Sequence, residues 1–246
     1  MKKKYQVALG VFMALIFMPK NAFAMHIMEG FLPPVWCISW GAISLPFIIL
    51  GMFSIKKKIE LNPRIKMLMA MAGAFTFSLS ALKIPSVTGS CSHPTGIGLG
   101  AILFGPTVMC VIGLIVLIFQ ALLLAHGGLT TLGANTFSMA VVGGLVAYFS
   151  YKLLKKMKLS QSISIFIAAA LGDIMTYVAT SLQLALAFPD KTGGFMASLV
   201  KFMGIFAVTQ IPLAISEGIL TVIIFNLLTA YSKDELIDLK VLSEEA

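Results

Sequence analysis

Long uncharged apolar runs alternate with short polar segments, many of them bearing lysines, along most of this chain. Runs of about 20 apolar residues are long enough for a helix to cross a hydrocarbon core of about 30 Å. The pattern therefore predicts membrane-spanning helices rather than the helices or strands of a soluble domain. They are expected at residues 35–55, 67–83, 107–126, 131–154, 162–188 and 202–229.

The distribution of lysines requires one more crossing than these six helices provide. Positive side chains gather in the cytoplasmic loops of membrane proteins. With residue 25 outside, the first helix places Lys56–Lys66 in the cytoplasm, but six crossings would leave Lys152–Lys158 outside. Residues 95–106 form the remaining apolar stretch, short and rich in glycine, which we expect to be a short or broken helix buried among its neighbours. The predicted fold class is an all-α polytopic membrane bundle of seven transmembrane segments.

The first 24 residues have the order of a secretory signal peptide. Lys2–Lys4 form a positive start, Val7–Phe17 is an apolar run too short to span a bilayer, and Ala22-Phe23-Ala24 has the small-residue pattern of a cleavage site. Cleavage after Ala24 would make Met25 the new N-terminus, on the outer face. Residues 25–246 would then form one multi-pass domain of the plasma membrane, with a cytoplasmic C-terminus. The alternative is an uncleaved signal anchor.

The amino-acid composition is that of a membrane protein, and together with the missing motifs it limits the classes of function that the chain can have. Hydrophobic residues make up 59% of the chain and charged residues only 11%, with a mean hydropathy of +0.97, so the surface of a water-soluble fold could not be covered. The basic residues that give the net charge of +8 lie mostly in the first twenty residues and in short clusters between apolar runs, which favours membrane orientation over nucleic-acid binding. No nucleotide-binding or hydrolase motif occurs, so we expect a transport subunit, not an enzyme, whose energy comes from another subunit.

After signal cleavage the chain would begin Met25-His26, and such a start can chelate a metal ion. The α-amine of Met25, the backbone amide of His26 and the His26 Nδ1 atom would form unstrained five- and six-membered chelate rings. Amide binding requires a metal that can displace the amide proton, such as Cu(II), Ni(II) or Co(II), and nitrogen-rich tetragonal sites favour such metals. His93, in a predicted outer loop, is the candidate fourth ligand. The alternative is that a histidine near the terminus is simply exposed.

Several residues near these histidines are candidates for supporting roles. Glu29 could accept a hydrogen bond from a ligating imidazole. Cys91 and Ser92 directly precede His93, and the Cys91 thiol could reach a metal, although it could equally be a small buried side chain. His126 ends a predicted span before two glycines, and we interpret it as a cap on the helix carbonyls.

Two acids lie inside predicted spans. Asp173 and Glu217 fall near mid-membrane depth, where ionisable side chains usually have a function. The alternative is a structural hydrogen-bonded arrangement with a polar partner such as Asn135.

Four segments of the chain resemble the CbiM/NikM family, the substrate-specific components of energy-coupling-factor importers. The residues in question are MHIMEGFLPP at 25–34, ALKIPSVTGSCSHPTG at 81–96, LAHGGLTTLGAN at 124–135 and KFMGIF at 201–206. The resemblance extends from Met25 to about Leu228. It implies a seven-span bundle that holds Co(II) in its core through Met25, His26 and His93.

The resemblance also implies partner subunits, but it does not decide between cobalt and nickel as the imported metal. A cobalt importer of this kind works with a transmembrane coupling subunit (CbiQ), a small membrane subunit (CbiN) and a cytoplasmic ATPase (CbiO), and supplies cobalamin biosynthesis. No organic cofactor and no nucleic acid is expected. Nickel import remains an alternative, because Ni(II) accepts the same nitrogens. An intramembrane metalloenzyme that uses Asp173 or Glu217 as acid or base is a less favoured alternative, and the spans are too apolar for an ion channel.

Overall fold

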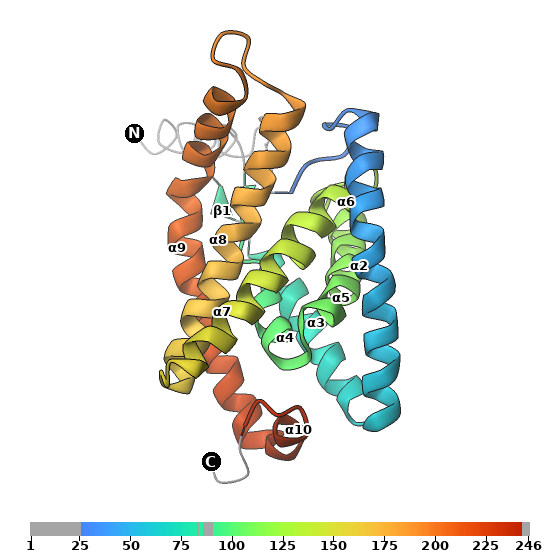
Figure 1. Cartoon of the computed structure of the whole chain (residues 1–246), viewed down its shortest axis with the longest axis vertical. Coiled ribbons are helices and arrows are strands. Elements are labelled where there is room, and N and C mark those ends of the chain that lie inside the picture. The colour runs from blue at the N-terminus through green and yellow to red at the C-terminus, as the bar shows by residue number, and fades with distance from the viewer. Residues whose placement is uncertain (1–25, 83, 86–90, 243–246) are drawn as a thin grey trace, which may run out of the picture.

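Long apolar helices make up most of the computed structural model, which describes residues 26–82, 84–85 and 91–242 (Figure 1). Within these residues, five helices are long and apolar enough to cross a membrane, and a sixth, α3 (Ile65–Ala81), is shorter. The prediction of an all-α membrane bundle is confirmed. The expected signal peptide, residues 1–24, lies outside the described part of the chain. The five helices are α2 (Pro34–Leu61), α5 (Pro106–Leu123), the composite helix Leu132–Lys156, α8 (Gln161–Ala187) and α9 (Gly194–Tyr231).

Shorter elements complete the described chain. The composite helix consists of α6 (Leu132–Asn135), a π-helical segment η2 (Thr136–Gly143) and α7 (Gly144–Lys156). A helix of eight residues, α4 (Ile97–Phe104), precedes α5, and α10 (Lys233–Asp238) follows α9. The strands β1 (Ile84–Pro85) and β2 (Cys91–Ser92) form a small antiparallel pair in which Ile84 lies opposite Ser92.

Local sequence explains where several helices begin. Pro34 and Pro106 occupy the first turns of α2 and α5, where the missing N–H of proline costs no hydrogen bond. Ser160 precedes α8, and its hydroxyl oxygen accepts the N–H of Ile163.

Two helices extend further than the sequence predicted. Helix α9 begins at Gly194 instead of residue 202, and α2 continues past residue 55 through its three lysines to Leu61. We placed the ends of both spans at lysines, yet a lysine at the end of an apolar helix can extend its stem toward water without ending the helix. The π-helical segment η2 and the β1–β2 pair were not predicted at all.

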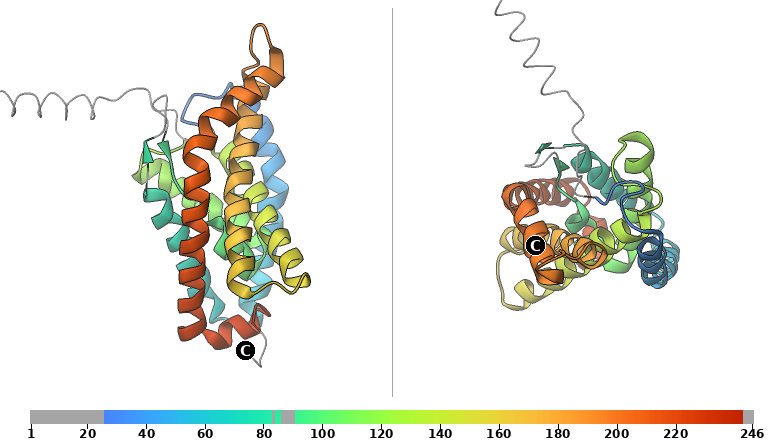
Figure 2. Two further views of the ribbon diagram at one scale, coloured as in Figure 1. Left: turned by 90° about the vertical axis from the view of Figure 1, so that its left-hand side faces the viewer. Right: turned by 90° about the horizontal axis from the view of Figure 1, so that it is seen from above.

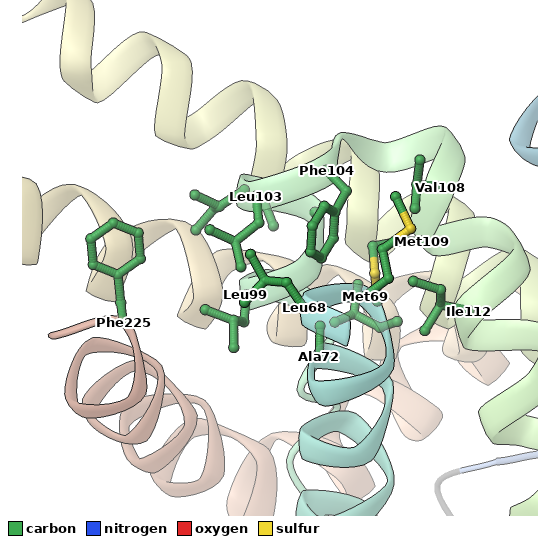
Figure 3. Close-up of a cluster of buried hydrophobic side chains, with 14 of the residues drawn as sticks. Leu68, Met69, Ala72, Leu99, Leu103, Phe104, Val108, Met109, Ile112 and Phe225 are labelled. Atoms are coloured by element: carbon green, nitrogen blue, oxygen red, sulfur yellow. The ribbon is translucent and has the colours of Figure 1, made fainter. Parts of the chain in front are cut away.

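The short helix α4 lies inside the bundle. All eight of its residues are buried, and Figure 3 shows Leu99, Leu103 and Phe104 among side chains from α3, α5 and α9. Gly98 allows this close packing, because a Cβ atom at its position would lie 2.8 Å from the Cα atom of Ala169 in α8. The residues 95–106 expected to form a short buried helix thus contain one.

The surface of the bundle suits contact with lipid. On α2, Val35 and Phe53 expose 73% and 67% of their surface, although both are large and apolar. Large exposed apolar surfaces are rare on soluble monomers. Both views in Figure 2 show the long helices running roughly along one common direction, as a membrane bundle requires.

Figure 1 also shows which segments share an end of the bundle. The C-terminal ends of α2 and α7 and the helix α10 lie at the lower end, whereas the start of α2 and the loop between α8 and α9 lie at the upper end. The lysine-rich C-terminal ends of α2 and α7 are therefore on the same side, as the distribution of charge predicted.

Candidate metal centre

Three histidines from distant parts of the chain meet inside the bundle. His26 precedes α2, His93 lies between β2 and α4, and His126 follows α5. All three are buried, with exposed fractions of 0%, 0% and 2%. One candidate ligand nitrogen from each ring lies within 4.8 Å of the others, and the ring centres are 4.6–5.0 Å apart. Nitrogens on one ion at about 2.0–2.1 Å would be separated by about 3 Å at right angles and about 4 Å when opposite, so the three nitrogens lie close to the spacing that a metal ion requires.

A backbone carbonyl sets the tautomer of His93. Its Nδ1 atom lies 2.8 Å from the carbonyl oxygen of Pro94, and because a carbonyl can only accept, Nδ1 must carry the hydrogen. In the neutral ring, the Nε2 atom then has the lone pair. Nε2 lies 2.8 Å from the Nε2 atom of His126, so His126 donates to it when the site holds no metal. The same carbonyl contact would orient His93 as a ligand through Nε2.

The segment that carries His26 is held by side chains of the composite helix and the loop before it. The Asn135 amide accepts the N–H of Ile27 at 2.9 Å and donates to the Ile27 carbonyl at 3.0 Å. The Thr131 hydroxyl donates to the same carbonyl at 2.6 Å. Both backbone groups of the residue after His26 are therefore satisfied in a buried setting, which fixes the direction in which His26 enters the bundle.

Two glycines bring the loop after His126 against this segment. Gly127 has a φ of +74°, which other residues rarely adopt. At Gly128 a Cβ atom would lie 2.5 Å from the Cα atom of Glu29, so no side chain fits there. Glu29 itself donates its backbone N–H to the Gly127 carbonyl, and its carboxylate accepts the N–H of Thr130. Hydrogen bonds from the Thr130 hydroxyl and N–H lower the pKa of Glu29. Through these bonds Glu29 holds the terminal segment against the loop.

The other predicted residues form a second buried group beside His93. The Ser92 hydroxyl lies 2.8 Å from that of Thr209 in α9. Glu217, also in α9, binds Thr95 through its carboxylate, and Asp173 in α8 accepts a hydrogen bond from Gln210. Met25 lies outside the described residues, as does the side chain of Cys91.

Sequence reasoning missed His126 as a member of the histidine cluster. It was interpreted as a helix cap, whereas the structure brings its ring against His93. The predicted topology held the missing signal, because it places all three histidines of the chain in segments at the outer face.

The donor set indicates which ions this centre can hold. It offers neutral nitrogen atoms in a buried setting, which suit Co(II), Ni(II), Cu(II) or Zn(II), whereas Mg(II) and Ca(II) prefer oxygen ligands.

Comparison with known proteins points to the same class of ion. Residues 26–235 match the model of the CbiM family, described as the cobalt uptake substrate-specific transmembrane region. The chain is 63% identical over 236 residues to the cobalt transport protein CbiM of Moorella thermoacetica, covering 96% of this chain and 91% of that one. It is 64% identical over 228 residues to CbiM of Thermosipho melanesiensis, covering 92% and 96%.

Solved structures of transition metal transporters share the fold. One crystal structure superposes with a TM-score of 0.73 at 28% identity, covering 85% of this chain and 94% of that one. A truncated transition metal transporter superposes with a TM-score of 0.71 at 27% identity, covering 84% and 99%.

Proposed function

Because the chain belongs to the CbiM family, we propose that it is the subunit of a cobalt importer that captures Co(II) at the outer face of the membrane. A role as a membrane component of cobalt uptake follows from the family and the fold. The observation that carries the capture role is the buried cluster of His26, His93 and His126, whose nitrogens lie close enough together to surround one ion.

We propose that four nitrogens bind the ion: the Met25 amine, the His26 amide, His26 Nδ1 and His93 Nε2. The tautomer of His93 supports this assignment, since its Nε2 lone pair is directed into the cluster. His126 would then be the residue that donates to His93 Nε2 in the absence of metal and gives way when Co(II) binds. The amine requires cleavage after Ala24.

The remaining features of the proposal concern assembly and orientation. The absence of a nucleotide-binding motif from the sequence supports dependence on partner subunits, which we propose to be CbiQ, CbiN and the ATPase CbiO of an energy-coupling-factor importer. The metal centre would face the outside, and the lysine-rich ends of α2 and α7 would face the cytoplasm. The imported ion would supply cobalamin biosynthesis.

Transport is favoured over catalysis by the partners of the two acids that an intramembrane enzyme would use. The two intramembrane acids bind Gln210 and Thr95, which gives them partners within the protein.

Metal analysis of the purified chain tests the proposal. Protein expressed with Co(II) or with Ni(II) in the medium is purified, its N-terminus is determined, and its metal content is measured. We expect one cobalt ion per wild-type chain and no bound cobalt in His26→Ala. We also expect the metal-loaded protein to catalyse no chemical reaction. Preferential retention of nickel would assign the chain to nickel import instead, and retention of neither ion would contradict the capture role.

A further inference from the structure

The short segment that carries His93 is fixed by side chains from two long helices. The Tyr177 hydroxyl of α8 donates to the His93 carbonyl at 3.2 Å. From α9, the Thr209 hydroxyl contacts that of Ser92 at 2.8 Å. The position of His93 therefore depends on helices that contribute none of the three imidazoles.

The strongest of these contacts is made by Glu217. Its carboxylate accepts both the backbone N–H and the hydroxyl of Thr95, the latter at 3.0 Å. Only Pro94 separates Thr95 from His93, and the proline ring fixes its own φ. Pro94 also supplies the carbonyl that binds His93 Nδ1. A shift of Thr95 would thus be passed through a stiff linker to the imidazole.

Glu217 is itself held in place. It is fully buried, as is Asp173 of α8, and the two carboxyl groups interact with one another. Asp173 is bound in turn by the amide of Gln210. Buried carboxyl groups are expensive in a membrane bundle, and apolar residues of similar size would often be as stable. Packing alone therefore gives no reason for an acid at this position.

We propose that Glu217 is a positioning residue for the metal centre, which holds the His93-Pro94-Thr95 segment so that His93 Nε2 faces the ion. The inference rests on the proposed function, because it takes His93 to be a ligand. It gives α9 a direct connection to the site. Any movement that separates Glu217 from Thr95 would weaken the hold on the metal.

A double-mutant cycle tests this role. Co(II) affinity is measured by competition with a chelator on the purified mature chain, for Glu217→Ala and Glu217→Gln, each alone and with His93→Ala. Glu217→Ala leaves a buried N–H without an acceptor, so we expect its affinity to fall about tenfold or more. Glu217→Gln keeps an oxygen that can accept this N–H, and its affinity should stay within about threefold of the wild type. In the His93→Ala background, Glu217→Ala should change the affinity by less than about twofold, since the two would act through one ligand.

Further variants separate positioning from folding and charge. Glu60→Ala removes an exposed acid whose ion pair with Lys56 is 3.9 Å long, and it should leave the affinity unchanged. If Glu217→Ala does not fold, Thr95→Val removes only the hydroxyl contact and should lower the affinity about threefold, again only when His93 is present.

Three results would overturn the proposal: an unchanged affinity in Glu217→Ala, equal losses with and without His93, or a loss in Glu217→Gln as large as in Glu217→Ala. The last would mean that the charge acts rather than the hydrogen bonds. An unchanged affinity in His93→Ala alone would instead contradict the ligand assignment itself, and the positioning role with it.

Discussion

At the scale of single residues, His93 has its two ring nitrogens in different roles. Nδ1 donates to the Pro94 carbonyl, and Nε2 accepts from His126. An incoming metal ion must therefore compete with the His126 hydrogen bond for the Nε2 lone pair. Because the alternative partner is an imidazole on a loop, the Nε2 lone pair has a hydrogen-bond partner when no metal is bound.

This arrangement predicts different costs for the two histidines. His93→Ala removes a ligand and should reduce Co(II) affinity by more than about a hundredfold, whereas His126→Ala removes only the group that competes with the ion for the Nε2 lone pair and should not reduce the affinity. Chelator competition on the purified chain measures both. Equal losses would make His126 a ligand and contradict the assignment of four nitrogens from Met25, His26 and His93.

A second prediction at this scale concerns the amine of Met25. Bulky replacements at Ala22 and Ala24 should block signal cleavage and leave no amine next to His26. We expect membrane insertion to persist while cobalt uptake is lost. Mass spectrometry of the purified protein establishes which residue begins the chain. Full uptake by protein that still begins at Met1 would contradict the role of the amine.

The sequence was informative about residues whose chemistry is local. The Met25-His26 start and the position of His93 in an outer loop could be interpreted from spacing and topology. The pairing of Glu217 with Thr95 joins residues 122 positions apart and depends on how α9 packs, for which a single sequence carries no signal. The same holds for Asn135, whose candidacy rested on its polarity inside a span rather than on any sign that it faces Ile27.

At the scale of elements, the start of the composite helix binds the segment that carries His26 and Ile27. Asn135 ends α6, and η2 begins at the next residue. π-helical segments are rare and often occur at functional sites. Here the segment directly follows the amide that binds Ile27. The hydrophobic pattern predicted one continuous helix, because a change from α to π hydrogen bonding leaves the apolar run uninterrupted.

Removing this amide should weaken the metal centre without removing a ligand. Asn135→Ala leaves the N–H of Ile27 buried and without its acceptor, at a cost of about 1–3 kcal/mol. If the His26 segment moves so that the N–H of Ile27 finds another acceptor, His26 is displaced and Co(II) affinity should fall about tenfold. Asn62→Ala is the matched control, because its amide binds Asp238 at an exposed site. An Asn135→Ala chain with lower thermal stability but unchanged affinity would show that Asn135 supports the fold alone.

At the scale of the whole molecule, the lysines and the buried helix α4 agree on one topology. Placing both lysine-rich segments in the cytoplasm required a crossing within residues 95–106, and α4 lies in this stretch, inside the bundle. Eight residues of helix rise only about 12 Å. If the chain crosses the membrane here, as the charges predict, the residues on either side of α4 must cover the rest of the distance. The helix is rich in glycine and is buried among its neighbours. These two features explain why so short a helix is tolerated at membrane depth.

The orientation of the bundle can be tested by labelling from one side of the membrane. In a chain whose native cysteines are replaced, Lys155→Cys should resist an impermeant thiol reagent in intact cells and react after permeabilisation, because the end of α7 is expected in the cytoplasm. Lys191→Cys is the matched control, since this exposed residue lies in the loop between α8 and α9, at the opposite end (Figure 1). It should react in intact cells. If the two positions exchange their behaviour, the bundle is inverted, and the metal centre would open toward the cytoplasm, where it could not capture an ion for import.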